Sequence, residues 1–280
     1  MTSPISTSRG RVLIIAGSDS GGGAGIQADI KTVTALGGYA ATAITAITAQ
    51  NTLGVSAVEP VSPAMIEAQA RAVLSDIGAD IIKTGMLGDA EVVELVARLL
   101  DEAAIPAVID PVMVAKGGAR LLADEALDVV RTLLVPRAGL LTPNAPEAAA
   151  LTGLTVETTN DLRRAGEALL RRGAGAVLMK GGHVPDSLGR EGRVTDLLMT
   201  VHGETVFEGE RIATRHTHGT GCTLASACAT GLAQGMSLEA AVARAWDYVH
   251  RAMLSAPGLG RGHGPLDQGW PLRERLGGKS

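Results

Sequence analysis

The chain has 280 residues, of which 46% are apolar and 19% are charged, and it carries a formal net charge of −4 at pH 7. This composition predicts a folded protein with a sizeable core, and an acidic balance without a run of basic residues argues against a nucleic-acid partner. The apolar runs are far too short to cross a bilayer or to form the core of a signal peptide. We therefore expect a cytoplasmic protein with no membrane partner.

Short apolar runs recur along the chain and are predicted to be strands. They are continuous rather than alternating, which is typical of strands covered by helices on both faces. In chain order the runs are 11–17, 41–48, 80–85, 107–112, 139–144 and 176–182. A later pair, 196–201 and 204–209, is joined by His202 and Gly203 and predicts a hairpin at the edge of the sheet.

Amphipathic segments lie between these strands and are predicted to be helices. The first runs over 63–77, with Ser62 as its N-cap and Pro63 at its first position. The others, in chain order, are 89–100, a helix that begins at Asn160, 219–234 and 238–253.

The alternation of strands and helices predicts an α/β protein: a three-layer sandwich whose central, mostly parallel sheet is flanked by helices. There is no internal repeat or linker, so we expect a single domain over 11–270, a flexible N-terminus at 1–10 and a C-terminal tail at 271–280. The polar segment 184–193 is predicted to be a mobile loop that acts as a lid.

Polar residues follow most of the predicted strands. The strand ends read AGSDSGGGAG, TAQN, KTGM, DPVM, TPNAPE and KGGH. Because ligands of open α/β sheets bind beyond the carboxyl ends of the strands, we expect these segments to meet at one crevice.

The glycine-rich segment 17–32 follows the first predicted strand. It lacks the glycine that a dinucleotide fingerprint would require at Ile26, so an NAD-dependent oxidoreductase is disfavoured. The segment is either a flexible turn or one whose bare backbone lets a small ligand lie close. Asp29, on the following helix, either hydrogen-bonds that ligand or is an ordinary solvated carboxylate.

Polar side chains at four other strand ends have two interpretations each. The side-chain amide of Gln50 has one acceptor and two donors, which match the hydrogen-bonding edge of an aminopyrimidine; alternatively, it is a turn amide that hydrogen-bonds to the backbone. Asp110 and Glu147 suit a hydrated Mg²⁺, whereas Asn144 and Glu147 also form the pattern of a helix capping pair; these two interpretations are compatible. Lys180 could meet a polyphosphate as a point charge, or it is a surface lysine.

The sharpest pattern is HTHGTGC, residues 216–222, at the start of an apolar helix. Gly219 to Gly221 would present converging backbone N–H groups and the positive end of a helix, which together make an anion pocket. Cys222 would lie at that helix end, where the dipole lowers a thiol pKa and a bound polyphosphate raises it. A metal pair at His216 and His218 is conceivable, but no third ligand is near.

The second cysteine, Cys228, lies six residues beyond Cys222. On a helix the two face different directions, so neither a disulfide nor a metal pair is expected. We expect Cys228 to be a core residue, and two free thiols fit a reducing compartment.

Several of these motifs, in this order, resemble the hydroxymethylpyrimidine and phosphomethylpyrimidine kinases of thiamine biosynthesis, which are ribokinase-like proteins. The resemblance covers about 11–267 and rests on IAGSDSGGGAGIQADIKT, TAQNT, KTGML, DPVM, TPNAPEAAALTG, VLMKGGH and HTHGTGCTLASA. It implies ATP-dependent phosphorylation of 4-amino-5-hydroxymethyl-2-methylpyrimidine (HMP) and then of the monophosphate. Mg²⁺ would accompany ATP, a monovalent cation is left open, and relatives are commonly homodimers.

The resemblance also implies roles for individual residues. The substrate pocket would contain Gly17, Ala24, Asp29, Gln50, Met86 and Val112. ATP would be bound by Asn144, Lys180, Gly219 and Gly221, with Asp110 and Glu147 organising Mg²⁺. The catalytic turn would be Gly219, Thr220, Gly221 and Cys222, with cysteine where most ribokinase-like enzymes carry an aspartate base.

Two other functions remain open at this point. A pyridoxal or pyridoxine kinase with the same cysteine would act on a similarly flat, hydroxymethylated heterocycle. A pyrimidine-binding module that has lost catalysis is disfavoured by the intact glycine turn, Glu147 and Lys180.

Overall fold

The computed structural model describes residues 9–114, 121–123, 125–184 and 192–277. The described chain contains one nine-stranded sheet in the order β3-β2-β1-β4-β5-β6-β7-β8-β9. Strands β2 to β7 in that order are parallel, whereas β3, β8 and β9 pair antiparallel at the two edges. The strands are β1 (Arg11–Asp19), β2 (Tyr39–Asn51), β3 (Gly54–Pro60), β4 (Ile81–Thr84), β5 (Ala107–Ile109), β6 (Leu140–Leu141), β7 (Ala176–Met179), β8 (Arg193–Thr200) and β9 (Gly203–Glu210).

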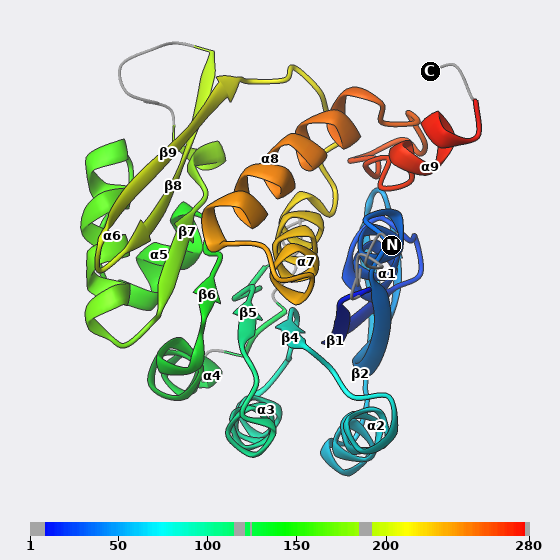
Figure 1. Ribbon diagram of the computed structural model, residues 1–280, viewed down its shortest axis with the longest axis vertical. Coiled ribbons are helices and arrows are strands. Elements are labelled where there is room, and N and C mark those ends of the chain that lie inside the picture. The colour runs from blue at the N-terminus through cyan, green and yellow to red at the C-terminus, as the bar shows by residue number, and fades with distance from the viewer. Residues whose placement is uncertain (1–8, 115–120, 124, 185–191, 278–280) are drawn as a thin grey trace, which may run out of the picture.

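Helices cover both faces of this sheet (Figure 1). On one face lie α2 (Pro63–Asp76), α3 (Ala90–Ala103), α4 (Ala126–Val129), α5 (Ala145–Thr152) and α6 (Thr159–Arg171). The other face carries α1 (Gly25–Ala35), α7 (Thr220–Ala233) and α8 (Leu238–Leu254), with the short α9 (Trp270–Arg275) beyond them. Each face has its own apolar cluster against the sheet. The predicted three-layer α/β sandwich is confirmed.

Side-chain caps fix where several predicted helices begin. Ser62 accepts a hydrogen bond from the N–H of Met65 ahead of α2, and Asp89 accepts one from the N–H of Val92 ahead of α3. Capping of this kind satisfies N–H groups that have no partner within the helix. The helix boundaries predicted from sequence therefore differ from the observed ones by only a few residues.

Strand β3 was missing from the sequence prediction. Most of its residues are exposed, and it is held by antiparallel pairing with β2, from Ala46 opposite Pro60 to Asn51 opposite Gly54. A strand with no buried face has no apolar signature in its sequence, which explains why it was missed. The hairpin of β8 and β9 does lie at the sheet edge as predicted.

Parts of the predicted terminal segments and of the predicted lid lie outside the described residues. Residues 1–8 of the expected N-terminal segment, and 185–191 of the expected lid, lie outside the described residues. Helix α9 (Trp270–Arg275) crosses position 271, where the tail was expected to start. Within the described part of the chain, no helix combines the length and the apolar character that crossing a membrane requires.

Candidate active site

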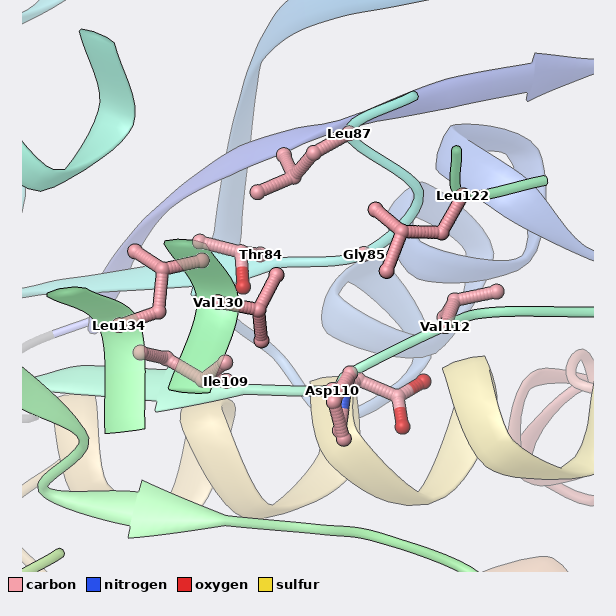
Figure 2. A pocket seen from close by; sticks show the side chains of 10 residues that line it. Thr84, Gly85, Leu87, Ile109, Asp110, Val112, Leu122, Val130 and Leu134 are labelled. Carbon is pink, nitrogen blue, oxygen red and sulfur yellow. The ribbon is translucent and has the colours of Figure 1, made fainter. Parts of the chain in front are cut away.

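The carboxyl ends of β4 and β5 enclose a cavity on the α3 side of the sheet (Figure 2). Its lining is Thr84, Gly85, Leu87, Ile109, Asp110, Pro111, Val112, Leu122, Val130 and Leu134. Asp110 is the charged residue among these, and Val112, a predicted substrate-pocket residue, lies beside it. On the neighbouring strand β1, a Cβ added to Gly17 would lie 2.3 Å from Cε of Met86, so these two predicted pocket residues are in contact.

A cluster of charged side chains joins the ends of β5, β6 and β7. The carboxylate oxygen Oδ1 of Asp110 accepts hydrogen bonds from Nζ of Lys180 and from the hydroxyl of Thr142, both at 3.1 Å. Nζ of Lys180 is also 3.8 Å from Oε2 of Glu147. Lys180 is largely buried here, so its interpretation as a surface lysine is wrong. Oδ2 of Asp110 is buried and has no hydrogen-bond partner among the described residues.

Asn144 and Glu147 form the predicted capping pair at the start of α5. The N–H of Asn144 donates to Oε2 of Glu147 at 2.8 Å, and the N–H of Glu147 donates to Oδ1 of Asn144 at 2.9 Å. The capping pair occupies the side-chain oxygen of Asn144 and leaves its NH₂ group available as a donor. Burial raises the pKa of Glu147 to about 7; Lys180 opposes this rise and Asp110 adds to it.

The Gly-Thr-Gly turn packs directly against this cluster. Gly219 is the N-cap of α7 with a φ of 85°, and no side chain of the described residues caps the helix there. A Cβ on Gly219 would lie 1.8 Å from the carbonyl oxygen of Gly23, and one on Gly221 would lie 3.2 Å from Nζ of Lys180. Glycine is therefore required at 219 by conformation and by contact, and the amide end of α7 faces a lysine.

Cys222 lies in the first turn of α7 and is partly exposed, whereas Cys228 is buried in the core as predicted; both are free thiols. The backbone N–H of Gly25 acts to lower the pKa of Cys222. Burial nevertheless raises the pKa of Cys222 to about 12, with Lys83 lowering it and Asp29 and Asp110 raising it. The thiol is thus protonated at neutral pH, and burial outweighs the effect of the helix end.

Asp29 does not lie where a ligand could reach it. It is fully buried, and its two oxygens receive Nζ of Lys83, each at 2.9 Å, while the Ser226 hydroxyl donates to Oδ1 at 2.7 Å. The expectation of a direct hydrogen bond to a ligand, and the alternative of a solvated carboxylate, both conflict with this position. Sequence reasoning also missed its partner Lys83, because a lysine in an apolar strand gives no sign of the carboxylate that it meets.

Asp19 was also missed, although it organises the first glycine-rich turn. Its carboxylate accepts the backbone N–H groups of Gly21 at 2.8 Å, Gly23 at 3.0 Å and Ala24 at 2.8 Å. Burial alone would raise its pKa, but these hydrogen bonds and one with His218 hold it below its ordinary value. The signal available in the sequence was an aspartate directly before a glycine run, a common turn-forming pattern.

Gln50 lies at the end of β2, close to the same turn. Its Nε2 is 3.3 Å from Nε2 of His218, which in turn is 2.9 Å from Oδ2 of Asp19. His218 is thus engaged by protein groups, and the described residues contain no group of three metal-ligating side chains. The possible metal pair at His216 and His218 gains no support.

A mostly parallel α/β sandwich, in which a glycine turn without a side-chain cap among the described residues faces Lys180 and Asp110, is typical of a phosphotransferase that acts on a small molecule. The chain belongs to the phosphomethylpyrimidine kinase family, whose model matches residues 19–267. It is 50% identical over 263 residues to the hydroxymethylpyrimidine/phosphomethylpyrimidine kinase of Streptomyces coelicolor, covering 94% of this chain and 96% of that one. It is 47% identical over 258 residues to the enzyme of the same name from Bacillus subtilis, covering 92% and 94%. The protein is therefore a kinase.

Solved structures of related kinases share this fold. Bacillus subtilis pyridoxal kinase, solved as an ADP complex, superposes with a TM-score of 0.86 at 35% identity, covering 94% of this chain and 98% of that one. Phosphomethylpyrimidine kinase from Clostridium difficile gives a TM-score of 0.76 at 40% identity, covering 87% and 99%. The fold is thus common to kinases of two different vitamins, and it does not select the substrate.

Proposed function

We propose that the protein transfers the γ-phosphoryl group of ATP to the hydroxymethyl group of HMP, and then a second phosphoryl group to the HMP phosphate. The observation that carries this proposal is the amide end of α7, with Gly221 against Lys180 and Asp110. The choice of substrate is supported by the sequence identity of 50% to the hydroxymethylpyrimidine/phosphomethylpyrimidine kinase of Streptomyces coelicolor and of 47% to that of Bacillus subtilis.

The substrate ring would lie between the ends of β1, β2 and β4. Gln50 would pair with the aminopyrimidine edge, because its amide supplies one acceptor and two donors. Gly17, Met86 and Val112 would form the apolar walls, with Ala24 at the start of α1. Asp29 has no contact role in this scheme, since it is buried beneath the site.

The nucleotide phosphates would lie between α7 and the charged cluster. Lys180 would meet them as a point charge, the Asn144 NH₂ group would donate to them, and the N–H groups of Gly219 to Cys222 would receive the transferred group. Asp110 and Glu147 suit Mg²⁺, because the buried Oδ2 of Asp110 has no hydrogen-bond partner in the described part of the chain and is free to act as a ligand atom. Mg²⁺ bound with ATP would neutralise phosphate charge.

Transfer requires the substrate hydroxyl oxygen to bond to the γ-phosphorus while the bond from that phosphorus to the ADP oxygen breaks. The hydroxyl proton then needs an acceptor, which we propose is the sulfur of Cys222. Phosphoryl transfer through a loose transition state depends mainly on positioning and charge neutralisation. A small thiolate fraction at Cys222 would therefore be sufficient.

An ADP-release assay with a panel of alcohols tests the proposed function. With ATP and Mg²⁺ we expect kcat/KM for HMP and its phosphate to exceed that for pyridoxal and pyridoxine at least about tenfold, roughly what one good polar contact contributes. Gln50→Leu should remove most of this preference. Exchanging KCl for choline chloride in the same assay tests for a monovalent-cation requirement.

Pyridoxal kinase is the second candidate, favoured by the TM-score of 0.86 to the Bacillus subtilis enzyme. A higher kcat/KM for the vitamin B6 alcohols would replace the HMP assignment with this one. Binding of HMP without any ADP release would instead indicate a module that has lost catalysis.

A further inference from the structure

A buried ion pair lies beneath the proposed site and has no part in the function described so far. Lys83 on β4 and Asp29 on α1 are both 0% exposed, and Nζ of Lys83 is 2.9 Å from each carboxylate oxygen. Buried ion pairs are weak stabilisers, because desolvation offsets most of the attraction between the charges. A lysine at the centre of an apolar sheet therefore calls for a reason other than stability.

The packing of α7 on α1 places this pair one helical turn from Cys222. A Cβ on Gly219 would lie 3.2 Å from Cα of Ala24, so the first turns of the two helices, with Cys222 and Gly25, lie against each other. Four residues further along both helices, Ser226 on α7 donates to Asp29 on α1 at 2.7 Å. Residues four apart on a helix lie on one face, about 6 Å from each other.

The ammonium group of Lys83 also points to the carboxyl end of the sheet. A Cβ added to Gly85, two residues beyond Lys83, would lie 3.2 Å from Nζ. Although β4 is a core strand, its lysine therefore places its charge at the edge where Cys222 lies.

Charged groups face Cys222 from several elements. Lys83 comes from β4, Asp29 from α1, Asp110 from the end of β5 and Lys180 from the end of β7. His218 precedes α7 and is paired with Asp19, and Glu147 lies 3.8 Å from Lys180. Lys180 is shared between two carboxylates, Asp110 and Glu147, whereas Lys83 is paired with one, Asp29, and it is Lys83 that lowers the pKa of Cys222.

Lys83 stays charged in this interior. Burial by itself favours the neutral amine, but Asp29, Cys222 and Asp110 together hold the pKa of Lys83 above its ordinary value. A fixed positive charge in a low-dielectric interior stabilises a neighbouring anion more than it would in water.

We propose that Lys83 is a positioning residue for proton transfer. Asp29 holds its ammonium group in place, and the ammonium group stabilises the thiolate of Cys222. The negative charge of Asp29 weakens this stabilisation. This rests on the proposed role of Cys222 as proton acceptor. When the hydroxyl proton moves to the sulfur, the thiolate becomes a thiol, and Lys83 and Asp29 keep their own protons and charges.

The test measures the thiolate of Cys222 without using catalysis. Alkylation of the unliganded enzyme by iodoacetamide is followed by mass spectrometry of the Cys222 peptide between pH 7 and 10, in a Cys228→Ala background. Because the thiolate is the reacting form, the rate at a given pH reports the thiolate fraction.

Asp29→Asn keeps the side-chain shape and removes the negative charge. We expect alkylation at pH 8 to become about tenfold faster, the effect of a shift of one pKa unit. Adding Lys83→Met to Asp29→Asn removes the cation in a background without an unpaired buried carboxylate. That double variant should react more slowly than Asp29→Asn by at least about tenfold, and more slowly than the wild type.

Opposite directions separate an electrostatic role from a structural one, because looser packing would speed alkylation in both variants. Faster alkylation in both, or no change in either, overturns the proposal. If Asp29→Asn does not fold, the double variant, which lacks both charges, is compared with the wild type: slower alkylation supports the proposal, and equal or faster alkylation refutes it. The alkylation experiment contains no phosphoryl acceptor. Its result can therefore be interpreted even if the ADP-release assay shows no activity with HMP.

The pH profile of kcat supplies a second readout. Between pH 7 and 10 kcat should rise with pH, as the thiolate fraction does, and the double variant should reach a given kcat only at a higher pH than the wild type. Coinciding profiles together with altered alkylation would remove Lys83 from the catalytic step, and so would contradict the proposal.

Discussion

Two glycine-rich turns meet at the active site, and they handle their backbone N–H groups in opposite ways. In the turn after β1, which we call the filled turn, the Asp19 carboxylate accepts hydrogen bonds from the N–H groups of Gly21, Gly23 and Ala24. The turn before α7, which we call the open turn, has no side-chain cap among the described residues, and Gly221 faces Lys180. Glycine content alone would have assigned a phosphate to both turns. The carboxylate in one and the lysine beside the other tell them apart.

The two turns also depend on each other. The carbonyl of Gly23 in the first turn lies where a Cβ of residue 219 would have to go, and it also accepts a hydrogen bond from Gln268. The filled turn therefore forms a rigid wall against which the open turn is positioned. We expect changes in the open turn to affect catalysis, and changes in the filled turn to affect mainly stability.

The largest effect is expected for Gly219→Ala. The added Cβ would lie 1.8 Å from the Gly23 carbonyl oxygen, so the N–H groups at the start of α7 must move. Loss of aligned donors should lower kcat/KM by about 10²- to 10³-fold. The matched control is Gly235→Ala just after α7, where φ is 80° and no atom lies within 4 Å of the added Cβ.

Gly235→Ala carries the same backbone strain, about 1–2 kcal/mol, without the collision. Its kcat/KM should stay within about twofold of the wild type, and both variants are compared by Tm and by the ADP-release assay. Equal activity of the two variants would show that the open turn has no special role.

The next largest effect is expected for Cys222→Ala. Removing the proton acceptor should lower kcat by about 10²-fold, while KM for HMP changes little because the thiol does not hold the ring. Cys228→Ala, on the same helix but in the core, should instead lower the free energy of unfolding by about 1–2 kcal/mol with kcat unchanged. An unchanged kcat in Cys222→Ala would reduce this cysteine to a space-filling residue.

The carboxyl groups beside the two turns should respond to pH in opposite ways. Because the pKa of Glu147 is raised to about 7, its carboxyl group is protonated below that pH and is free to act as the proposed Mg²⁺ ligand above it. The affinity for Mg²⁺-ATP, measured by calorimetry, should therefore rise about tenfold from pH 6 to pH 8. Glu147→Gln should bind weakly at both pH values, whereas Glu94→Gln on the exposed face of α3 should keep the rise. A rise that persists in Glu147→Gln would exclude Glu147 as its source.

Asp19 should have the smallest effect on catalysis and a clear effect on stability. Its pKa is lowered in the folded protein, so its stabilisation is present above the ordinary value of 3.8 and is lost as the pH falls through the lower, folded value. Asp19→Asn should lower the free energy of unfolding by about 2 kcal/mol at pH 7, and by less below pH 4. Urea unfolding at several pH values measures this difference. A deficit that is the same at pH 7 and at pH 3 would contradict the assigned hydrogen bonds.

Local sequence patterns predicted much of the fold correctly. Ser62 caps α2, as predicted, and Asp89, predicted as the first residue of the next helix, caps α3. The hairpin of β8 and β9 lies at the sheet edge. Periodicity and capping depend on near neighbours in the chain, so a single sequence carries them. Strand β3 escaped because pairing with β2, rather than a buried face, holds it in place.

The candidate site divides in the same way. The sequence by itself determined the turn from Gly219 to Cys222, the strand-end residues Asp110 and Lys180, and the capping pair of Asn144 and Glu147, because these are local motifs at element ends. Only the tertiary structure decided that Asp19 also pairs with His218, that Asp29 is internal, and that Lys83 is the partner of Asp29. Such pairings join residues 54 to 199 positions apart, and the burial that sets their charges exists only once the sheet and both helix layers have come together.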